Sequence, residues 1–110
     1  MNIQIFGKSK CFDTKKAERY FKERRIKFQA VDLKKYGMSK GELTSVKNAV
    51  GLEALLDPKA ADAPLVTYLA YDEDKLEKLL EDPRLLRTPI VRNGKLATVG
   101  YCPDVWKTWT

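Results

Sequence analysis

Histidine is absent from all 110 residues of this sequence. Without imidazole, the chain cannot form the Ser-His or Cys-His pairs that activate many nucleophiles, and it lacks the commonest ligand of catalytic zinc. We therefore expect neither a metal site nor a resident cofactor. If the protein does nucleophilic chemistry, a thiolate must act without a neighbouring imidazole base.

Cysteine is scarce as well, with only Cys11 and Cys102. Two cysteines do not build the disulfide framework that is typical of small secreted domains. Long apolar runs are also missing, since no stretch approaches the roughly 20 residues that cross a membrane. The N-terminus lacks the charged-then-apolar layout of a signal peptide. These absences predict a cytoplasmic protein with no membrane partner.

Basic residues exceed acidic residues only moderately: the sequence has 21 Lys and Arg and 15 Asp and Glu, which gives a net charge of +6. Such a balance would suit an anionic partner. The basic residues are scattered through every segment, however, which is typical of a solvated surface. No basic-aromatic platform or known motif supports direct binding of nucleic acid, and we expect none.

In the first third of the chain, the spacing of hydrophobic residues changes from that of a strand to that of a helix and back. Residues 2–6 are predicted to form a buried strand, and residues 13–25 a helix with Asp13 as its N-cap. Residues 28–32 alternate and predict a second strand. A strand, a helix and a strand within about thirty residues predict a βαβ unit with parallel strands.

The middle of the chain is predicted to be mostly helical. Residues 39–42 form a capping box that opens a helix ending at Gly51, and residues 52–56 add a further turn. Residues 65–71 have a strand-like composition in a helical setting and stay ambiguous. Residues 72–81 show clear helical spacing with acidic residues in the first turn.

Strand patterns return near the C-terminus, where residues 89–92 and 95–99 flank Asn93-Gly94, a strong hairpin signal. A last helix is expected to begin at Pro103. The residues that it should bury are Val105, Trp106 and Trp109.

The order of these elements is βαβ, then helices, then ββα. This order predicts an α/β protein of thioredoxin-like fold with a four-stranded mixed sheet. We expect one domain over residues 1–110, with a helical insertion over about 37–83.

Cys11 lies between the first predicted strand and the first predicted helix. A thiol at a helix N-terminus faces unpaired backbone N–H groups and the positive end of the helix dipole, and both lower its pKa. With Asp13 engaged in capping, nearby lysines should favour the thiolate further; they are Lys8, Lys10, Lys15 and Lys16. This placement predicts a reactive thiolate, and an inert cysteine packed in a turn is the alternative.

Three stretches resemble the arsenate reductase-related (ArsC/Spx) family. They are CFDTKKA at 11–17, LRTPIV at 86–91, and Gly94-Lys95 together with Val99-Gly100-Tyr101. The resemblance runs through almost the whole chain in order and spacing. It implies a thioredoxin fold in which Pro89 is a cis-proline whose loop faces the cysteine.

Arsenate reductases of this family hold their oxyanion with arginines. The family arginine before the cis-proline is replaced here by Thr88, and the one after the last strand's glycine by Tyr101. No arginine occurs between residues 26 and 83, from which the third would come. We therefore do not expect authentic arsenate reduction, and Arg87 is the candidate for replacing part of the missing charge. Thr88 before Pro89 instead resembles glutaredoxins and thioredoxins, whose backbone pairs with an extended thiol substrate there.

The redox regulators of the family carry Cys-x-x-Cys, and here Thr14 takes the fourth position. The site thus resembles single-cysteine members, for which a glutathione-linked thiol role is implied. Cys11 would attack a disulfide, Thr14 would donate a hydrogen bond to its sulfur, and glutathione or another external thiol would resolve the mixed disulfide. The residues expected to contact substrate are Lys10, Arg87, Thr88, Pro89 and Tyr101.

Cys102 follows Tyr101 directly, at a place that the resemblance puts near the active site. It is a candidate resolving thiol for Cys11, and a packed, unreactive cysteine is the alternative.

Three classes of function stay open at this point. The first is a monomeric thiol oxidoreductase acting on a small thiol, a small disulfide or a protein. The second is an Spx-like transcriptional regulator that docks on RNA polymerase. The third is a diverged domain with neither activity.

Overall fold

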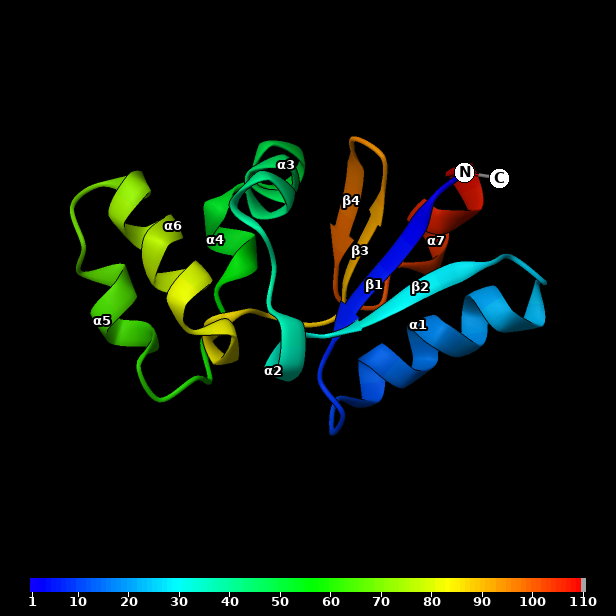
Figure 1. Cartoon of the computed structure of the whole chain (residues 1–110), viewed down its shortest axis with the longest axis horizontal. Coiled ribbons are helices and arrows are strands. Elements are labelled where there is room, and N and C mark those ends of the chain that lie inside the picture. Colours follow the sequence, from blue (N-terminus) through cyan, green and yellow to red (C-terminus); the bar gives the residue numbers. More distant parts are fainter. Residues whose placement is uncertain (110) are drawn as a thin grey trace.

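In a computed structural model, which describes residues 1–109, four strands form one mixed sheet in the order β2-β1-β3-β4 (Figure 1). β1 (Ile3–Gly7) pairs in parallel with β2 (Phe28–Asp32). On its other side β1 pairs antiparallel with β3 (Ile90–Asn93), which pairs antiparallel with β4 (Leu96–Val99). The predicted parallel βαβ unit and the four-stranded mixed sheet are confirmed.

One face of the sheet is covered by α1 (Phe12–Glu23), α7 (Pro103–Trp106) and the 3₁₀ turn η2 (Lys107–Trp109). Alternate strand residues point to this face, as the period of a pleated strand requires. Its buried cluster joins the sheet to α1 and α7 through Ile3, Ile5, Ala17, Tyr20, Phe21, Val91 and Trp106.

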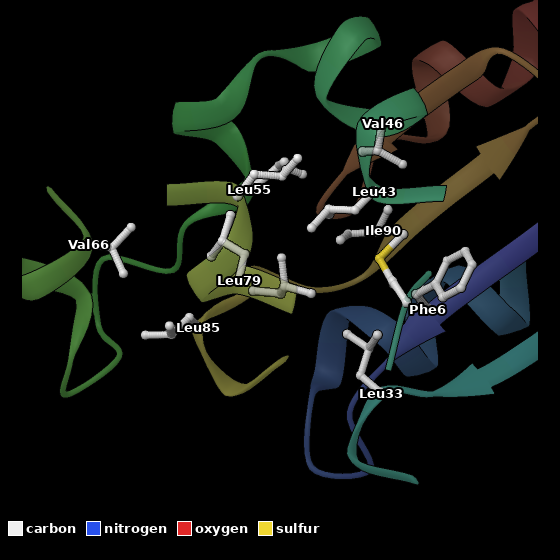
Figure 2. Packing of buried hydrophobic residues seen from close by; sticks show 12 residues of the cluster. Phe6, Leu33, Leu43, Val46, Leu55, Val66, Leu79, Leu85 and Ile90 are labelled. Atoms are coloured by element: carbon white, nitrogen blue, oxygen red, sulfur yellow. The ribbon is translucent and has the colours of Figure 1, made fainter. Parts of the chain in front are cut away.

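The opposite face of the sheet carries the helical segment between β2 and β3, which packs against Phe6 and Ile90 (Figure 2). This segment begins and ends slightly outside the predicted limits of 37 and 83. Its elements are α2 (Leu33–Tyr36), α3 (Lys40–Val50), α4 (Leu52–Leu55), α5 (Ala63–Thr67), α6 (Asp72–Glu81) and the 3₁₀ turn η1 (Pro83–Leu85). We call α4, α5, α6 and η1 the helical lobe; α5 and α6 lie to one side of the sheet in Figure 1.

Capping signals in the sequence correctly predicted where two of the middle helices begin. Ser39 accepts a hydrogen bond from the Glu42 backbone N–H, and the Glu42 carboxylate accepts one from the Ser39 N–H, so the predicted capping box is present. α6 has the predicted bounds. The ambiguous residues 65–71 contain the end of a short helix that stops at Thr67, so their strand-like composition does not form a strand.

The hairpin turn differs by one residue from the prediction. Asn93 pairs with Leu96, so the two turn residues are Gly94 and Lys95 rather than Asn93-Gly94. Gly94 has a φ of +61°, which glycine adopts without steric cost and which suits the first central position of a type II′ turn. The final helix starts at Pro103 as predicted.

Two further sequence predictions are wrong. Val105 is exposed, because only Trp106 of the short α7 points into the core. Asp13 is not the N-cap of α1, because the helix begins at Phe12 and Cys11 takes the cap position.

Thr98 anchors the indole of the fully buried Trp106, whose Nε1 donates a hydrogen bond of 2.8 Å to the Thr98 hydroxyl. We expect Thr98→Val, which keeps the side-chain shape, to lower the free energy of unfolding by about 1–3 kcal/mol, because the buried indole N–H of Trp106 loses its hydrogen-bond acceptor. Urea titration followed by circular dichroism measures this. Thr44→Val, a half-buried threonine of α3, is the control, and equal losses in both variants would contradict the assignment.

Candidate functional site

Cys11 is the N-cap residue of α1, directly after the loop that leaves β1. Its backbone N–H donates to the carbonyl of Lys8, and its own carbonyl accepts from the Lys15 N–H, so the loop and the first helical turn are held together. The side chain makes no capping hydrogen bond as a neutral thiol. The free N–H groups of the first turn are therefore available to a negatively charged sulfur.

Competing effects set the pKa of Cys11. Burial, the largest single effect, raises the pKa, but hydrogen bonds from the side chains of Thr14 and Thr88 and from the backbone N–H groups of Thr14 and Asp13 lower it. The net result is a pKa below the ordinary value of a thiol. The lowering comes from these hydrogen bonds rather than from the lysine charges predicted from the sequence.

Thr14 lies one helical turn after Cys11, on the side of α1 that faces the sheet. The residue is only 7% exposed. Its hydroxyl is buried and has no other hydrogen-bond partner among residues 1–109, so it is available to donate to the Cys11 sulfur. An unsatisfied buried hydroxyl costs stability, and an ionised cysteine removes that cost.

Gly7 allows this arrangement, and sequence reasoning did not single it out. A Cβ atom at Gly7 would overlap the Thr14 side chain. Glycine is therefore needed at the last residue of β1 so that the first turn of α1 can lie directly against the strand. The only signal in the sequence was a glycine between a strand and a cysteine loop, which is too common to be specific.

The segment before β3 forms the opposite wall of the site. The Thr88–Pro89 peptide bond is cis, as the family resemblance implied, and the Cys11 Sγ donates to the Thr88 carbonyl oxygen at 3.7 Å. Pro89 is buried, and its carbonyl accepts a 2.8 Å hydrogen bond from the Gly100 N–H. Thr88 and Pro89 therefore lie beside the thiol.

Lys8 connects the cysteine loop to the end of the helical lobe. Its Nζ donates to the carbonyl oxygens of Arg84 at 3.0 Å and of Leu86 at 2.8 Å. We predicted this lysine as a nearby charge for the thiolate. It instead acts as a clamp that fixes the segment leading into Thr88.

The other predicted contact residues are spread around the thiol. Lys10 is exposed and lines a 510 Å³ hollow beside Pro83 and Arg84. Arg87 is exposed and lines a separate 680 Å³ cavity of the helical lobe together with Asp72 and Lys75.

Tyr101 packs its ring on Trp106, with 5.6 Å between ring centroids, and remains 44% exposed. The Lys16 ammonium lies 5.7 Å from the centre of the Tyr101 ring. Tyr101 is thus an accessible aromatic surface between α1 and the C-terminal turn.

Cys102 is half-buried against the cluster around Trp106, and its Sγ donates to the Val99 carbonyl at 3.4 Å. Burial raises its pKa above the ordinary value, and the nearby Asp13 carboxylate adds to this. At a given pH, Cys102 is therefore less ionised than Cys11. Its role as a resolving thiol stays a prediction.

The part of the chain that the structure describes has neither a metal-binding cluster nor a membrane-spanning helix. Residues 1–109 contain no cluster of three or more side chains that could hold a metal ion. None of the helices within these residues is long and apolar enough to span a membrane.

A cysteine that caps the helix of a βαβ unit, beside a Thr–cis-Pro loop, defines a protein of the thioredoxin-like class. The chain belongs to the ArsC family, whose family model matches residues 6–109.

Individual relatives agree with this assignment. Global transcriptional regulator Spx 2 from Oceanobacillus iheyensis is 30% identical, over 94% of this chain and 80% of its own length. Among solved structures, arsenate reductase from Vibrio cholerae superposes with a TM-score of 0.83 at 20% identity, covering 96% of this chain and 94% of that one. The glutaredoxin-like NrdH-redoxin from Escherichia coli superposes with a TM-score of 0.53 at 16% identity, over 100% and 96% of the two chains. The predicted thioredoxin-like fold is confirmed.

The contact between Gly7 and Thr14 can be tested through the thiol. We expect Thr14→Val and Gly7→Ala each to raise the pKa of Cys11, because the first removes a hydroxyl donor and the second displaces it. Iodoacetamide alkylation of Cys11 against pH, in a Cys102→Ser background, measures the pKa. Gly41→Ala on α3, where a Cβ meets open space, is the control and should leave it unchanged. An unshifted pKa in Thr14→Val would contradict the role of the hydroxyl.

Proposed function

We propose that this chain is a thiol–disulfide oxidoreductase in which the Cys11 thiolate is the nucleophile. The observation that carries the proposal is the position of the sulfur: Cys11 caps α1 beside the buried Thr14 hydroxyl, and its Sγ lies 3.7 Å from the carbonyl of Thr88, which precedes cis-Pro89. Hydroxyl and backbone N–H donors beside a sulfur stabilise its thiolate without an imidazole base. The substrate is a small disulfide or a disulfide in a protein.

The reaction has two exchange steps. The Cys11 thiolate attacks one sulfur of the substrate disulfide, a mixed disulfide forms, and the second substrate sulfur leaves with the electron pair of the broken bond. An external thiolate, from glutathione or a protein, then attacks the mixed disulfide and releases Cys11. Thr14 takes the position of the second cysteine in a Cys-x-x-Cys motif. Because no cysteine stands there, resolution by an external thiol is favoured.

The Thr88–Pro89 loop supports substrate binding in the same scheme. The Thr88 carbonyl already lies within 3.7 Å of the sulfur as acceptor of its hydrogen bond. Thr88 is also only half-buried, so part of this residue is exposed beside the thiol. An extended segment that carries the substrate disulfide can pair with this backbone while its sulfur meets Cys11, as the resemblance to glutaredoxins implies.

Arsenate is not the substrate in this proposal. Thr88 and Tyr101 occupy the two places where the family's arsenate reductases carry arginine, and Arg87 lines a cavity of the helical lobe. A tetrahedral oxyanion is best held by planar guanidinium groups, and these two positions do not supply them.

A second candidate is a regulator that acts by docking, and one specific observation favours it. The relative with 30% identity is named as the global transcriptional regulator Spx 2. Thr14 removes the Cys-x-x-Cys switch of such regulators but leaves docking untouched.

Single substitutions of the two cysteines test the proposal directly. We expect Cys11→Ser to abolish glutathione-coupled reduction of hydroxyethyl disulfide, whereas Cys102→Ser retains most of the rate. Because the pKa of Cys11 is lowered, the rate of Cys11 alkylation should rise with pH through a midpoint below that of the cysteine in a short unstructured peptide measured under the same conditions. A midpoint at or above that value, or full turnover by Cys11→Ser, would rule the proposal out.

Binding to purified RNA polymerase separates the two candidates. If Cys11 chemistry is the function, wild-type protein and Cys11→Ser should show no stable complex with the polymerase in gel filtration at micromolar concentration. A stoichiometric complex that forms equally with both proteins would favour the docking regulator instead.

A further inference from the structure

A hollow of 460 Å³ lies between α1 and the C-terminal turn, and its lining includes Tyr101, one of the predicted contact residues. We call it the basic groove, and define it by Lys16, Arg19, Tyr20, Arg24, Tyr101 and Lys107. We propose that the basic groove binds acidic side chains of a peptide whose disulfide reacts at Cys11. This inference rests on the proposed function and names its substrate class.

The charge of the basic groove is strongly unbalanced. Among residues 1–109, the lining contains four cationic side chains and one carboxylate, that of Glu23. Lys107 is already paired, with Asp104 at 3.7 Å, so the inference depends on Lys16, Arg19 and Arg24. The groove therefore offers a positive potential to an acidic partner.

Aromatic rings hold two of these cations without neutralising them. The Arg24 guanidinium stacks 3.7 Å from the centre of the Tyr20 ring and donates to the Tyr20 carbonyl at 3.2 Å. Lys16 lies over the Tyr101 ring. Cation–π contact orients a side chain while its full charge stays available to a carboxylate.

The floor of the groove is rigid. Tyr20 is 5% exposed, and its ring packs edge-on against Trp106 at 5.1 Å and Phe21 at 5.0 Å between centroids. Tyr101 packs on the same Trp106 ring. Cations on a fixed aromatic floor need little ordering when a ligand arrives, which favours binding.

The hollow that Lys10 lines fits an acidic partner less well. Its Lys8 ammonium is occupied by two backbone carbonyls. Its Arg84 guanidinium makes two hydrogen bonds of 2.8 Å with the Asp82 carboxylate. Lys10 and Lys34 are the cations that remain in this hollow, against Lys16, Arg19 and Arg24 in the basic groove, so charge complementarity favours the basic groove.

The spacing along α1 indicates a peptide rather than glutathione. At 1.5 Å per residue, Lys16 and Arg19 lie about 7.5 and 12 Å along the helix axis from Cys11, and Arg24 about 20 Å. An extended peptide covers about 3.3–3.6 Å per residue, so acidic residues two to six positions from the reacting cysteine reach these cations. Glutathione, whose carboxylates lie within one residue of its thiol, spans a smaller part of this length than such a peptide does.

The test uses peptides whose single cysteine is activated as a 2-pyridyl disulfide. Cys11 attacks the peptide sulfur, a Cys11–peptide disulfide forms, and 2-thiopyridone leaves with the electron pair and is read by its absorbance. Each peptide carries Glu two to six positions before or after the cysteine, and its twin carries Gln there. At low salt we expect the acidic peptide to react about tenfold faster than its twin, an advantage that high salt removes.

Charge reversal locates the effect, measured as the ratio of acidic to neutral peptide rates in each variant. In Lys16→Glu/Arg19→Glu the ratio should fall below one, and in Lys16→Gln/Arg19→Gln it should fall towards one. Lys95→Glu makes the same kind of charge change in the hairpin turn, at the opposite end of the sheet (Figure 1), and should keep the wild-type ratio.

The outcomes separate this inference from the proposed function. If Cys11 reacts readily but acidic and neutral twins react equally, or if reversal at the groove and at Lys95 lowers the ratio alike, the groove inference is overturned. If Cys11 reacts with none of the peptides faster than free cysteine does, the proposed function fails first. A clear preference for acidic peptides that the groove variants abolish supports both.

Discussion

The close approach of Gly7 and Thr14 is the constraint on which the site depends. Because residue 7 has no side chain, the first turn of α1 lies directly on the end of β1. This contact buries the Thr14 hydroxyl and places Cys11 at the cap position, with the free N–H groups of the first turn around its sulfur. Gly7, the last residue of β1, therefore determines the surroundings of a thiol four residues farther along the chain.

This environment compensates for the missing histidine by hydrogen bonding rather than by net charge. An imidazolium would provide one movable proton and one charge, whereas hydroxyl and backbone donors provide fixed dipoles. Burial alone would raise the pKa of Cys11, as it does for Cys102. Both thiols are half-buried, so the difference in their pKa comes from the donors around Cys11 and, for Cys102, also from the nearby Asp13 carboxylate.

The sequence predicted those parts of the fold that depend on local patterns. The Ser39–Glu42 capping box, the bounds of α6 and the parallel pairing of β1 with β2 follow from spacing and from chain connectivity. The hairpin turn was one residue off, because its register is set by pairing across the sheet. The roles of Gly7 and Lys8 could not be predicted, since each depends on contact with a segment whose position only the folded chain defines. The contact of Arg87 with the helical-lobe cavity was missed for the same reason.

The Lys8 clamp has a mechanical consequence. One ammonium group holds carbonyls on either side of Leu85, and the Arg87 N–H donates to Leu55 in the helical lobe. These hydrogen bonds tie the lobe to the thiol loop, although the two segments lie far apart in sequence. A displacement of the lobe that leaves the sulfur undisturbed would have to break these bonds first. The insertion thus braces the loop that carries Cys11.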